Sequence, residues 1–247
     1  MAAIENQSGI RTFGRVEDLD LEFTSADRPT LVTALLAHCA GRDAEYWWMQ
    51  PVGARAAALL ELLAFNGNAD RIELSASCVA PQCGEMFGFP LGLRELAAQV
   101  PREDICQVSL SDDRRVTLRR PIGRDLLRWR AARPATREQA LTMMLNDLVL
   151  DGHPETKDAA TLAQALADSD PLVSLDVEAE CPACGLAQDV AIDVEGLVLA
   201  HFRQQQRVLL HDVHRLATEY GWTELEVLNV PPSRRAVYLS LIEGAPG

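Results

Sequence analysis

Aromatic residues are scarce in this chain of 247 residues, at 5%, although apolar residues of all kinds make up 48%. Leucine and alanine must therefore fill most of the core, and these residues favour helices over strands. No run of 18 apolar residues occurs, so the sequence predicts no transmembrane helix. The N-terminal residues also lack the basic and then apolar pattern of a secretory signal. We therefore expect a cytoplasmic protein without a membrane partner.

Motifs of enzymes are missing as well. The chain has no phosphate-binding GxxxxGK[ST], no GxGxxG after a strand, no HExxH and no GxSxG. His211 and His214 share a face of a predicted helix, but no third metal ligand accompanies them. No carboxylate is marked by a motif as a general acid or base. These absences favour a protein that is not an enzyme.

Basic residues are also fewer than acidic residues. The chain has 23 Lys and Arg against 36 Asp and Glu, which gives a net charge of −13. Binding to nucleic acid draws on basic side chains that release counterions from phosphates, so we expect no nucleic-acid partner. The densest basic stretch holds arginines 114, 115, 119, 120, 124, 128 and 130. Asp112, Asp113 and Asp125 interleave with them, which favours a solvated face over a phosphate site.

Hydrophobic periodicity predicts an α+β fold that is mostly helical. Helices are expected at 27–40, 52–65, 91–99, 124–132, 136–150, 155–168, 195–220 and 232–243. Alternating residues predict three hairpins, at 71–91, 105–120 and 172–194. Thr223 and Glu226 form a capping box that opens one more short helix. Residues 1–24 show no period and are expected to be a flexible N-terminal arm.

The order of these elements indicates how the chain is organised. We expect residues 25–247 to form a single mixed α+β domain, because a long helical insert joins the hairpins at 71–91 and 172–194. Residues 195–247 would form a C-terminal helical unit. The alternative is two independent domains.

Four of the six cysteines lie in two similar turns. Cys78 and Cys83 enclose Val-Ala-Pro-Gln, Cys181 and Cys184 enclose Pro-Ala, and a glycine follows each second cysteine. Two such knuckles at hairpin tips present four thiolates tetrahedrally, as in structural zinc sites. We predict a split zinc ribbon with one structural Zn²⁺, because four thiolates leave no open position for catalysis. The alternatives are unmetallated turns, or a redox pair, although a redox CxxC normally opens a helix.

The remaining cysteines, Cys39 and Cys106, fall on apolar stripes and are expected to be plain core residues.

The C-terminal stretch 209–244 combines several short patterns. They comprise His214, Leu216, Ala217, Tyr220, Gly221, Trp222, Glu224, Arg234, Arg235, Tyr238 and Leu239. These residues resemble the ending of phage baseplate proteins related to the hub-assembly factors of T-even phages. That group also occurs in prophage and contractile injection-system gene clusters. Looser similarity covers the Pro51 helix entry, residues 70–73 and residues 118–125, with Ile122 where threonine is expected.

The resemblance implies a structural or assembly component of a contractile phage-tail-like baseplate, near its hub. Its partners would be baseplate or hub proteins, and the protein would be cytoplasmic or part of the assembled particle. Both cysteine knuckles are similar to those of zinc-binding members of the group. The alternative function is a zinc-ribbon adaptor for a transcription or other nucleic-acid machine. Against it, Glu85, Glu180 and Asp189 flank the knuckles where such adaptors carry basic residues.

Four residues of the C-terminal unit are candidate partner contacts. They are Trp222, Arg234, Arg235 and Tyr238, whose residue types carry most of the binding energy at interfaces. The alternative is that the two aromatic side chains pack on the long helix and complete the core, since short helices need tertiary packing to persist.

Overall fold

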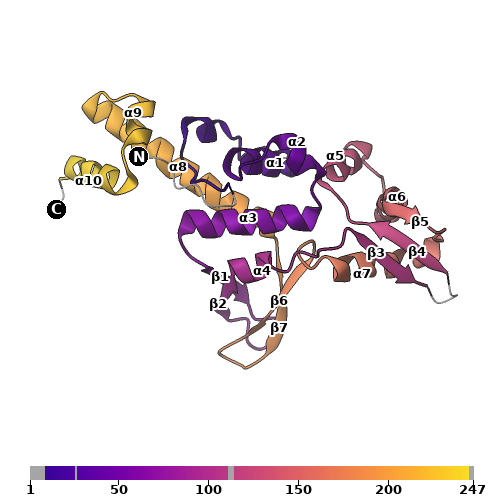
Figure 1. The fold of residues 1–247 in the computed structure, drawn as a ribbon. Coiled ribbons are helices and arrows are strands. Elements are labelled where there is room, and N and C mark those ends of the chain that lie inside the picture. Colours follow the sequence, from indigo (N-terminus) through magenta and orange to yellow (C-terminus); the bar gives the residue numbers. More distant parts are fainter. Residues whose placement is uncertain (1–8, 26, 111–113, 245–247) are drawn as a thin grey trace.

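The structure is a computed structural model that describes residues 9–25, 27–110 and 114–244 (Figure 1). It is α+β and mostly helical, and it confirms the three hairpins and each predicted helix within a few residues. The helices are α1 (Arg28–Cys39), α2 (Ala44–Met49), α3 (Val52–Gly67), α4 (Leu93–Ala97), α5 (Gly123–Ala132), α6 (Arg137–Leu148), α7 (Ala159–Ser169), α8 (Val194–Tyr220), α9 (Glu224–Asn229) and α10 (Pro232–Ile242). Two 3-10 turns are η1 (Val16–Asp20) and η2 (Thr156–Asp158).

Within the described residues, the strands form three separate small antiparallel sheets. The first pairs β1 (Arg71–Ser77) with β2 (Met86–Gly92), and the last pairs β6 (Leu175–Glu180) with β7 (Ala187–Ile192). Between them in sequence, β3 (Ile105–Ser109), β4 (Arg115–Arg119) and β5 (Val149–Asp151) form a three-stranded sheet in that order. None of the helices in the described part of the chain combines the length and the apolar character needed to cross a membrane.

The main core lies among α1, α3 and α8. Helix α3 is apolar around most of its circumference, so it is buried between its neighbours and runs through the centre of the helical body (Figure 1). Leu35 of α1, Leu59 of α3 and Phe202 of α8 are all completely buried there. Leucine and alanine supply most of this core, as the composition predicts.

The N-terminal segment packs on this core, so the prediction of a flexible arm is wrong for residues 10–21. Ile10, Phe13 and Leu21 are buried in the main core. Asp18 is completely buried and accepts hydrogen bonds at 2.6 and 2.7 Å from the Arg11 guanidinium. The segment is held by separate buried residues and so shows no regular hydrophobic period. The sequence pattern therefore did not predict that it packs on the core. Residues 1–8 of the predicted arm lie outside the described residues.

Gln206 of α8 locks the same segment in place. Its side-chain amide donates to the carbonyls of Asp18, Leu19 and Leu21, at 3.3, 3.0 and 2.8 Å. A buried amide that satisfies three backbone carbonyls fixes the segment against the long helix.

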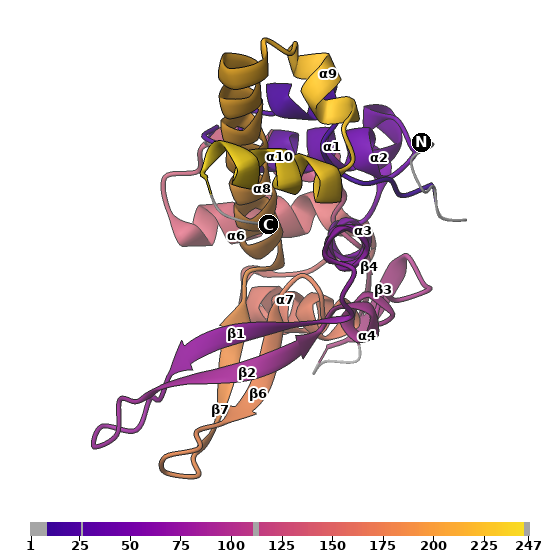
Figure 2. The same cartoon turned by 90° about the vertical axis from the view of Figure 1, so that its left-hand side faces the viewer.

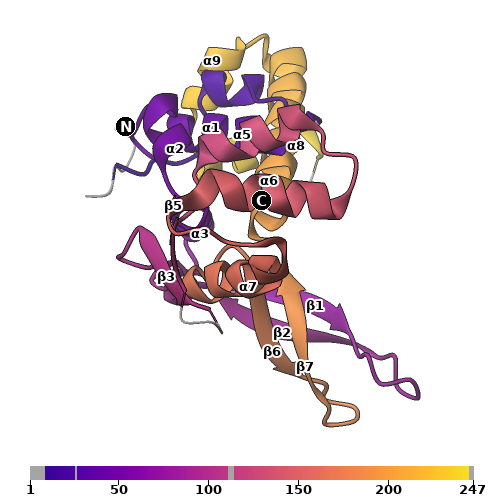
Figure 3. The same ribbon diagram turned by 90° about the vertical axis from the view of Figure 1, so that its right-hand side faces the viewer.

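A second module combines the β3–β4–β5 sheet with α5, α6 and α7, and Figure 3 views it from its own side. Its separate core includes Val116, Leu118, Trp129, Leu145 and Leu162. That residues 25–247 form a single domain stays a prediction.

Two similar turns join the module to the body. Pro51-Val52-Gly53 and Pro121-Ile122-Gly123 open α3 and α5 and pair as an antiparallel bridge. The Val52 amide donates to the Pro121 carbonyl at 2.8 Å, and the Gly123 amide donates to the Gln50 carbonyl at 3.1 Å. A Cβ on Gly53 would lie 1.9 Å from a carboxylate oxygen of buried Asp170. Glycine is therefore required here so that the carboxylate can approach the start of α3.

The arginine-rich stretch is only partly a solvated face, which corrects the prediction. Arg120 is buried and pairs with Asp104 at 2.8 Å and with Asp170 at 3.3 Å. Arg119 forms a two-pronged ion pair with buried Asp125, at 2.5 and 2.9 Å. The stretch therefore stabilises the junction through internal charge pairs. Asp112 and Asp113 lie outside the described residues.

Candidate metal centre

The hairpins β1–β2 and β6–β7 lie side by side, and their tips point in the same direction (Figure 2). Each hairpin alternates inward and outward residues along both strands. The inward residues Ala76, Phe87, Phe89 and Ala179 form a small hydrophobic cluster together with Cys78 and Cys181. This cluster holds the two hairpins together next to the cysteines.

The two knuckles close in a similar way, although the first encloses four residues and the second encloses two. The amide of Cys78 donates to the Glu85 carbonyl at 2.8 Å, and the amide of Cys181 donates to the Leu186 carbonyl at 3.0 Å. The glycine after each second cysteine is left-handed, with φ of 63° at Gly84 and 72° at Gly185. Glycine adopts this conformation without steric cost, so it lets each knuckle turn back sharply.

The four predicted cysteines meet between the hairpins. The Sγ atoms of Cys78 and Cys184 lie 3.5 Å apart, and those of Cys83 and Cys181 lie 3.8 Å apart. All four sulfurs fall within 4.8 Å of one another. A zinc ion with sulfur at about 2.3 Å in a tetrahedron requires sulfur separations of about 3.8 Å. The four cysteines are therefore positioned to hold a metal ion, and the donor set is the one that structural zinc prefers.

Backbone amides point at the sulfurs and influence their ionisation. Burial raises the pKa of Cys181, but hydrogen bonds from the amides of Ala183 and Cys184 bring it down to about 7. At Cys78 the Ala80 amide lowers the pKa, while burial and the neighbouring thiols outweigh it and raise the pKa to about 12. Four sulfurs this close cannot all carry negative charge unless a cation lies between them. A bound dication would supply that charge, and four thiolates would leave it no open position.

Gln188 is a further residue of this site that the sequence analysis missed. Its side-chain oxygen accepts from the amide of Val79 at 2.9 Å, and its nitrogen donates to the Ser77 carbonyl at 3.0 Å. One amide side chain thus joins the second hairpin to the first, as a strand neighbour would. The sequence does hold a sign of this role. Gln188 takes one of the inward-facing positions of β7, where an apolar residue is expected.

The outer face of the β6–β7 hairpin is acidic. Asp176, Glu178, Glu180 and Asp189 are all exposed, and Glu178 lies directly opposite Asp189 in the register. Like charges in facing positions repel each other and also repel phosphates. This face therefore argues against the nucleic-acid alternative.

The two remaining cysteines and the paired histidines of α8 lie away from the four-cysteine cluster. Cys39 is completely buried in the main core, where burial first, and the nearby Asp18 charge second, raise its thiol pKa to about 12. Cys106 is half-buried in the second module, and its thiol faces the Ala165 carbonyl at 3.6 Å. His211 and His214 are exposed on α8. In the described part of the chain, the four-cysteine cluster is the one group arranged to hold a metal.

The candidate partner residues lie in the C-terminal unit, where α9 and α10 fold back on the far end of α8 (Figure 1). Trp222 stacks on Tyr220 with ring centroids 5.0 Å apart and meets Tyr238 edge-on at 5.1 Å. Arg234 is exposed. Arg235 is buried instead and pairs with Asp212 of α8 at 3.2 Å. This corrects the expectation for Arg235, because its guanidinium holds α10 on α8 and does not face a partner.

The capping box in the same unit is confirmed. The Thr223 amide donates to a Glu226 carboxylate oxygen at 2.8 Å, and the Glu226 amide donates to the Thr223 hydroxyl at 3.3 Å.

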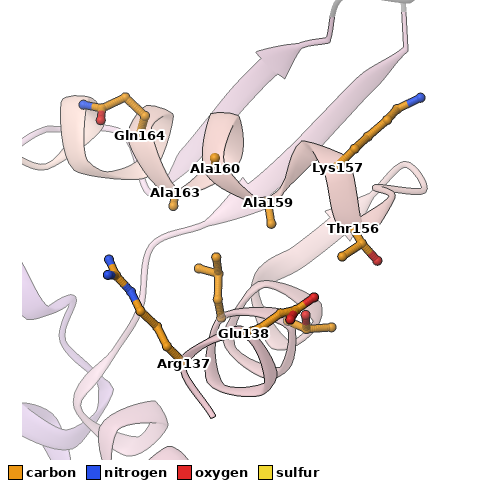
Figure 4. A pocket seen from close by; sticks show the side chains of 10 residues that line it. Arg137, Glu138, Thr156, Lys157, Ala159, Ala160, Ala163 and Gln164 are labelled. Atoms are coloured by element: carbon orange, nitrogen blue, oxygen red, sulfur yellow. The ribbon is translucent and has the colours of Figure 1, made fainter.

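One hollow of the surface lies away from all these residues. It is an open groove of about 700 Å³ between α6 and the η2–α7 segment (Figure 4). Leu141, Ala159, Ala160 and Ala163 form its apolar part, and Arg137, Glu138 and Gln164 stand at its edges. It contains no cysteine or histidine.

Comparisons of the chain with protein-family models, curated proteins and solved structures give no match.

Proposed function

We propose that this protein is a structural or assembly component of a contractile phage-tail-like baseplate, close to its hub, and that one structural zinc ion closes its fold. The observation that carries the metal part is the meeting of four sulfurs within 4.8 Å, two from each hairpin. A site made only of thiolates holds a metal firmly and offers no coordination position to a substrate. The metal then serves the architecture of the protein.

The arrangement suits a component that must present surfaces in fixed positions. The close sulfur pairs join residues 106 and 98 positions apart in sequence. A metal at this point would lock the first hairpin, at the end of α3, to the second hairpin, at the start of α8. Because α8 leads directly to α9 and α10, the same closure would hold the C-terminal unit in a fixed orientation to the body.

The baseplate role is supported by the resemblance of residues 209–244. In the structure these residues build the C-terminal unit, whose aromatic stack and exposed Arg234 lie at the end of a long helix. Tyr and Arg side chains in such a position are typical of protein interfaces. The aromatic rings also pack on each other, so their contribution to folding must be separated from any contribution to binding.

Replacing Arg234 can test binding without disturbing the fold, because this side chain is exposed and pairs with no other described residue. Tail-like particles would be purified from cells that carry an epitope-tagged copy of this protein in place of the original. We expect the tagged protein in the particles, or particle formation that depends on it. Arg234→Ala should reduce incorporation or particle yield, whereas Arg137→Ala, at another exposed position, should not. Normal particles in cells without the protein, with none of it in the wild-type particles, would refute the proposal.

A further inference from the structure

Large apolar side chains are exposed at several places on the molecule, and two groups of them lie at its separate ends. Val79, Met86 and Leu186, exposed by 68%, 61% and 39%, lie at the tips of the two hairpins. Val237 and Leu241, exposed by 55% and 59%, lie on α10. Exposed apolar groups gathered at a projecting end are typical of interaction surfaces. Figure 1 shows the hairpins and α10 projecting from different parts of the molecule.

The apolar residues at the hairpin tips depend on the cysteine site for their arrangement. We call Val79, Met86 and Leu186 the tip surface. Val79 follows Cys78 and is held to the second hairpin through its amide bond to Gln188. Leu186 belongs to the other hairpin, where its carbonyl accepts from the Cys181 amide. The surface therefore combines residues about a hundred positions apart, and it is complete only when the two hairpins are closed on each other.

Acidic residues of the same two hairpins lie near the tip surface in sequence. Glu85, Glu180 and Asp189 are exposed, and no cation of the described residues pairs with them. An apolar centre with a charged rim is the usual anatomy of a protein interface. The matching partner surface must be apolar with positive charge beside it.

Helix α10 has such a surface. Its inner face, with Arg235 and Tyr238, packs toward α8 and Trp222. Val237 and Leu241 are four residues apart and exposed, and Arg234, three residues before Val237, is exposed beside them. We call these three residues the α10 ridge. The positive end of the α10 dipole lies next to Arg234 and adds to its charge.

We propose that the tip surface of one copy of this protein docks on the α10 ridge of a second copy. The contact joins two different surfaces, so it is head-to-tail and builds a ring or an open chain of copies. Because the tip surface is complete only in the closed hairpins, assembly requires the bound metal. The inference rests on the metal part of the proposed function, and its test leaves unchanged Arg234, the residue through which the baseplate role is tested.

Sedimentation equilibrium of zinc-loaded protein tests the contact. The mass should rise above the 27.1 kDa of one chain as concentration increases. A tip variant, Val79→Ser with Met86→Gln, and a ridge variant, Val237→Glu with Leu241→Glu, should each stay at the mass of one chain. The control Leu150→Gln changes a residue exposed by 56% on β5 and should associate as the wild type does.

Mixing the two variants gives the sharpest result. The tip variant keeps a ridge and the ridge variant keeps a tip, so the mixture should form pairs of one copy each and nothing larger. A mixture that stays at one chain would overturn the proposal. So would zinc-loaded wild type that stays at one chain up to about 1 mM, where even a millimolar contact is detected.

Two further arms test the surface and the metal. If Ala160→Arg in the α6–α7 groove abolishes association while the tip variant still associates, the ridge binds the groove and the proposal is wrong. Wild type freed of metal by a chelator should return to one chain, and association of equal strength without metal would overturn the metal requirement. Zinc is measured in every sample. Wild type without zinc refutes the proposed metal site, whereas zinc-bearing protein that stays at one chain refutes this inference alone.

Discussion

Replacing Cys184 by serine should remove much of the stability of the folded chain. The change keeps the size of the side chain nearly constant but substitutes a hydroxyl for a metal-binding thiolate. Cys184 is exposed, so the substitution leaves no cavity in the core. The loss of stability should therefore report the metal alone.

The magnitude follows from the binding of the ion, which needs all four thiolates and therefore binds the folded chain but not the unfolded one. Such an ion stabilises the folded chain by about 4.1 kcal/mol when free zinc is a thousandfold above its dissociation constant. The small hydrophobic cluster and the Gln188 bridge remain in the variant, so the strands of the two hairpins still pack, while the knuckles at their tips lose the ion that fixes them. We expect Cys184→Ser to lower the free energy of unfolding by about 3–5 kcal/mol, a large share of the total for an ordinary domain.

Urea unfolding followed by far-ultraviolet circular dichroism measures this loss, and elemental analysis of the same samples measures zinc. For the wild type, each tenfold increase in free zinc above the dissociation constant should add about 1.4 kcal/mol, because the ion binds the folded chain. The control Cys106→Ala should keep one zinc per chain. The reasoning is refuted if wild-type stability does not depend on free zinc, or if Cys184→Ser loses less than about 1 kcal/mol.

Three further changes test other parts of the structure. Gly53→Ala would force a Cβ to within 1.9 Å of the Asp170 carboxylate and should lower the free energy of unfolding by about 3 kcal/mol. Gly67→Ala in the same helix meets no atom within 4 Å and should be neutral or stabilising by up to about 1 kcal/mol, and equal effects in urea unfolding would contradict the placement of Asp170. Gln188→Ala removes two hydrogen bonds between the hairpins and should cost about 1–2 kcal/mol while zinc content stays unchanged, so a loss of zinc would show that the amide also builds the metal site. Burial raises the pKa of Asp18, but Arg11 and two backbone amides outweigh it and hold the pKa below its usual value. The ion pair therefore stabilises the fold above about pH 4 and loses its effect as the pH falls through the lowered pKa. Asp18→Asn should be less stable than wild type by about 3 kcal/mol at neutral pH, and a gap in urea unfolding that persists in acid would refute this account.

The helices and hairpins could be predicted because long amphipathic segments carry their period in the sequence. The cysteine site could be predicted too, since two turns with the same pattern of cysteine, proline and glycine form the two halves of one site. Helix α2, with six residues, and β5, with three, are too short to show a period. These elements are held by the body around them.

Single buried polar residues that hold segments together could not be predicted from the sequence. Asp18 and Gln206 look like ordinary surface residues in sequence, yet both are buried and hold the N-terminal segment. Arg234 and Arg235 are neighbours with opposite environments, because the rotation of α10 about its axis is set by its contact with Asp212 of α8. A contact between residues 23 positions apart cannot be inferred from either helix alone.

The placement of Gln206 and of the second knuckle has a consequence for synthesis on the ribosome. Ribosomes add about 5–20 residues per second, so the 98 positions from Cys83 to Cys181 take roughly 5–20 seconds to make. During that interval the nascent chain has two thiols of a four-thiol site, and the N-terminal segment has no Gln206 to hold it. The body, the metal site and the N-terminal anchor can close only in the last part of translation. The yield of folded protein should therefore depend on protection of the emerging chain during this interval and on the supply of zinc at its end.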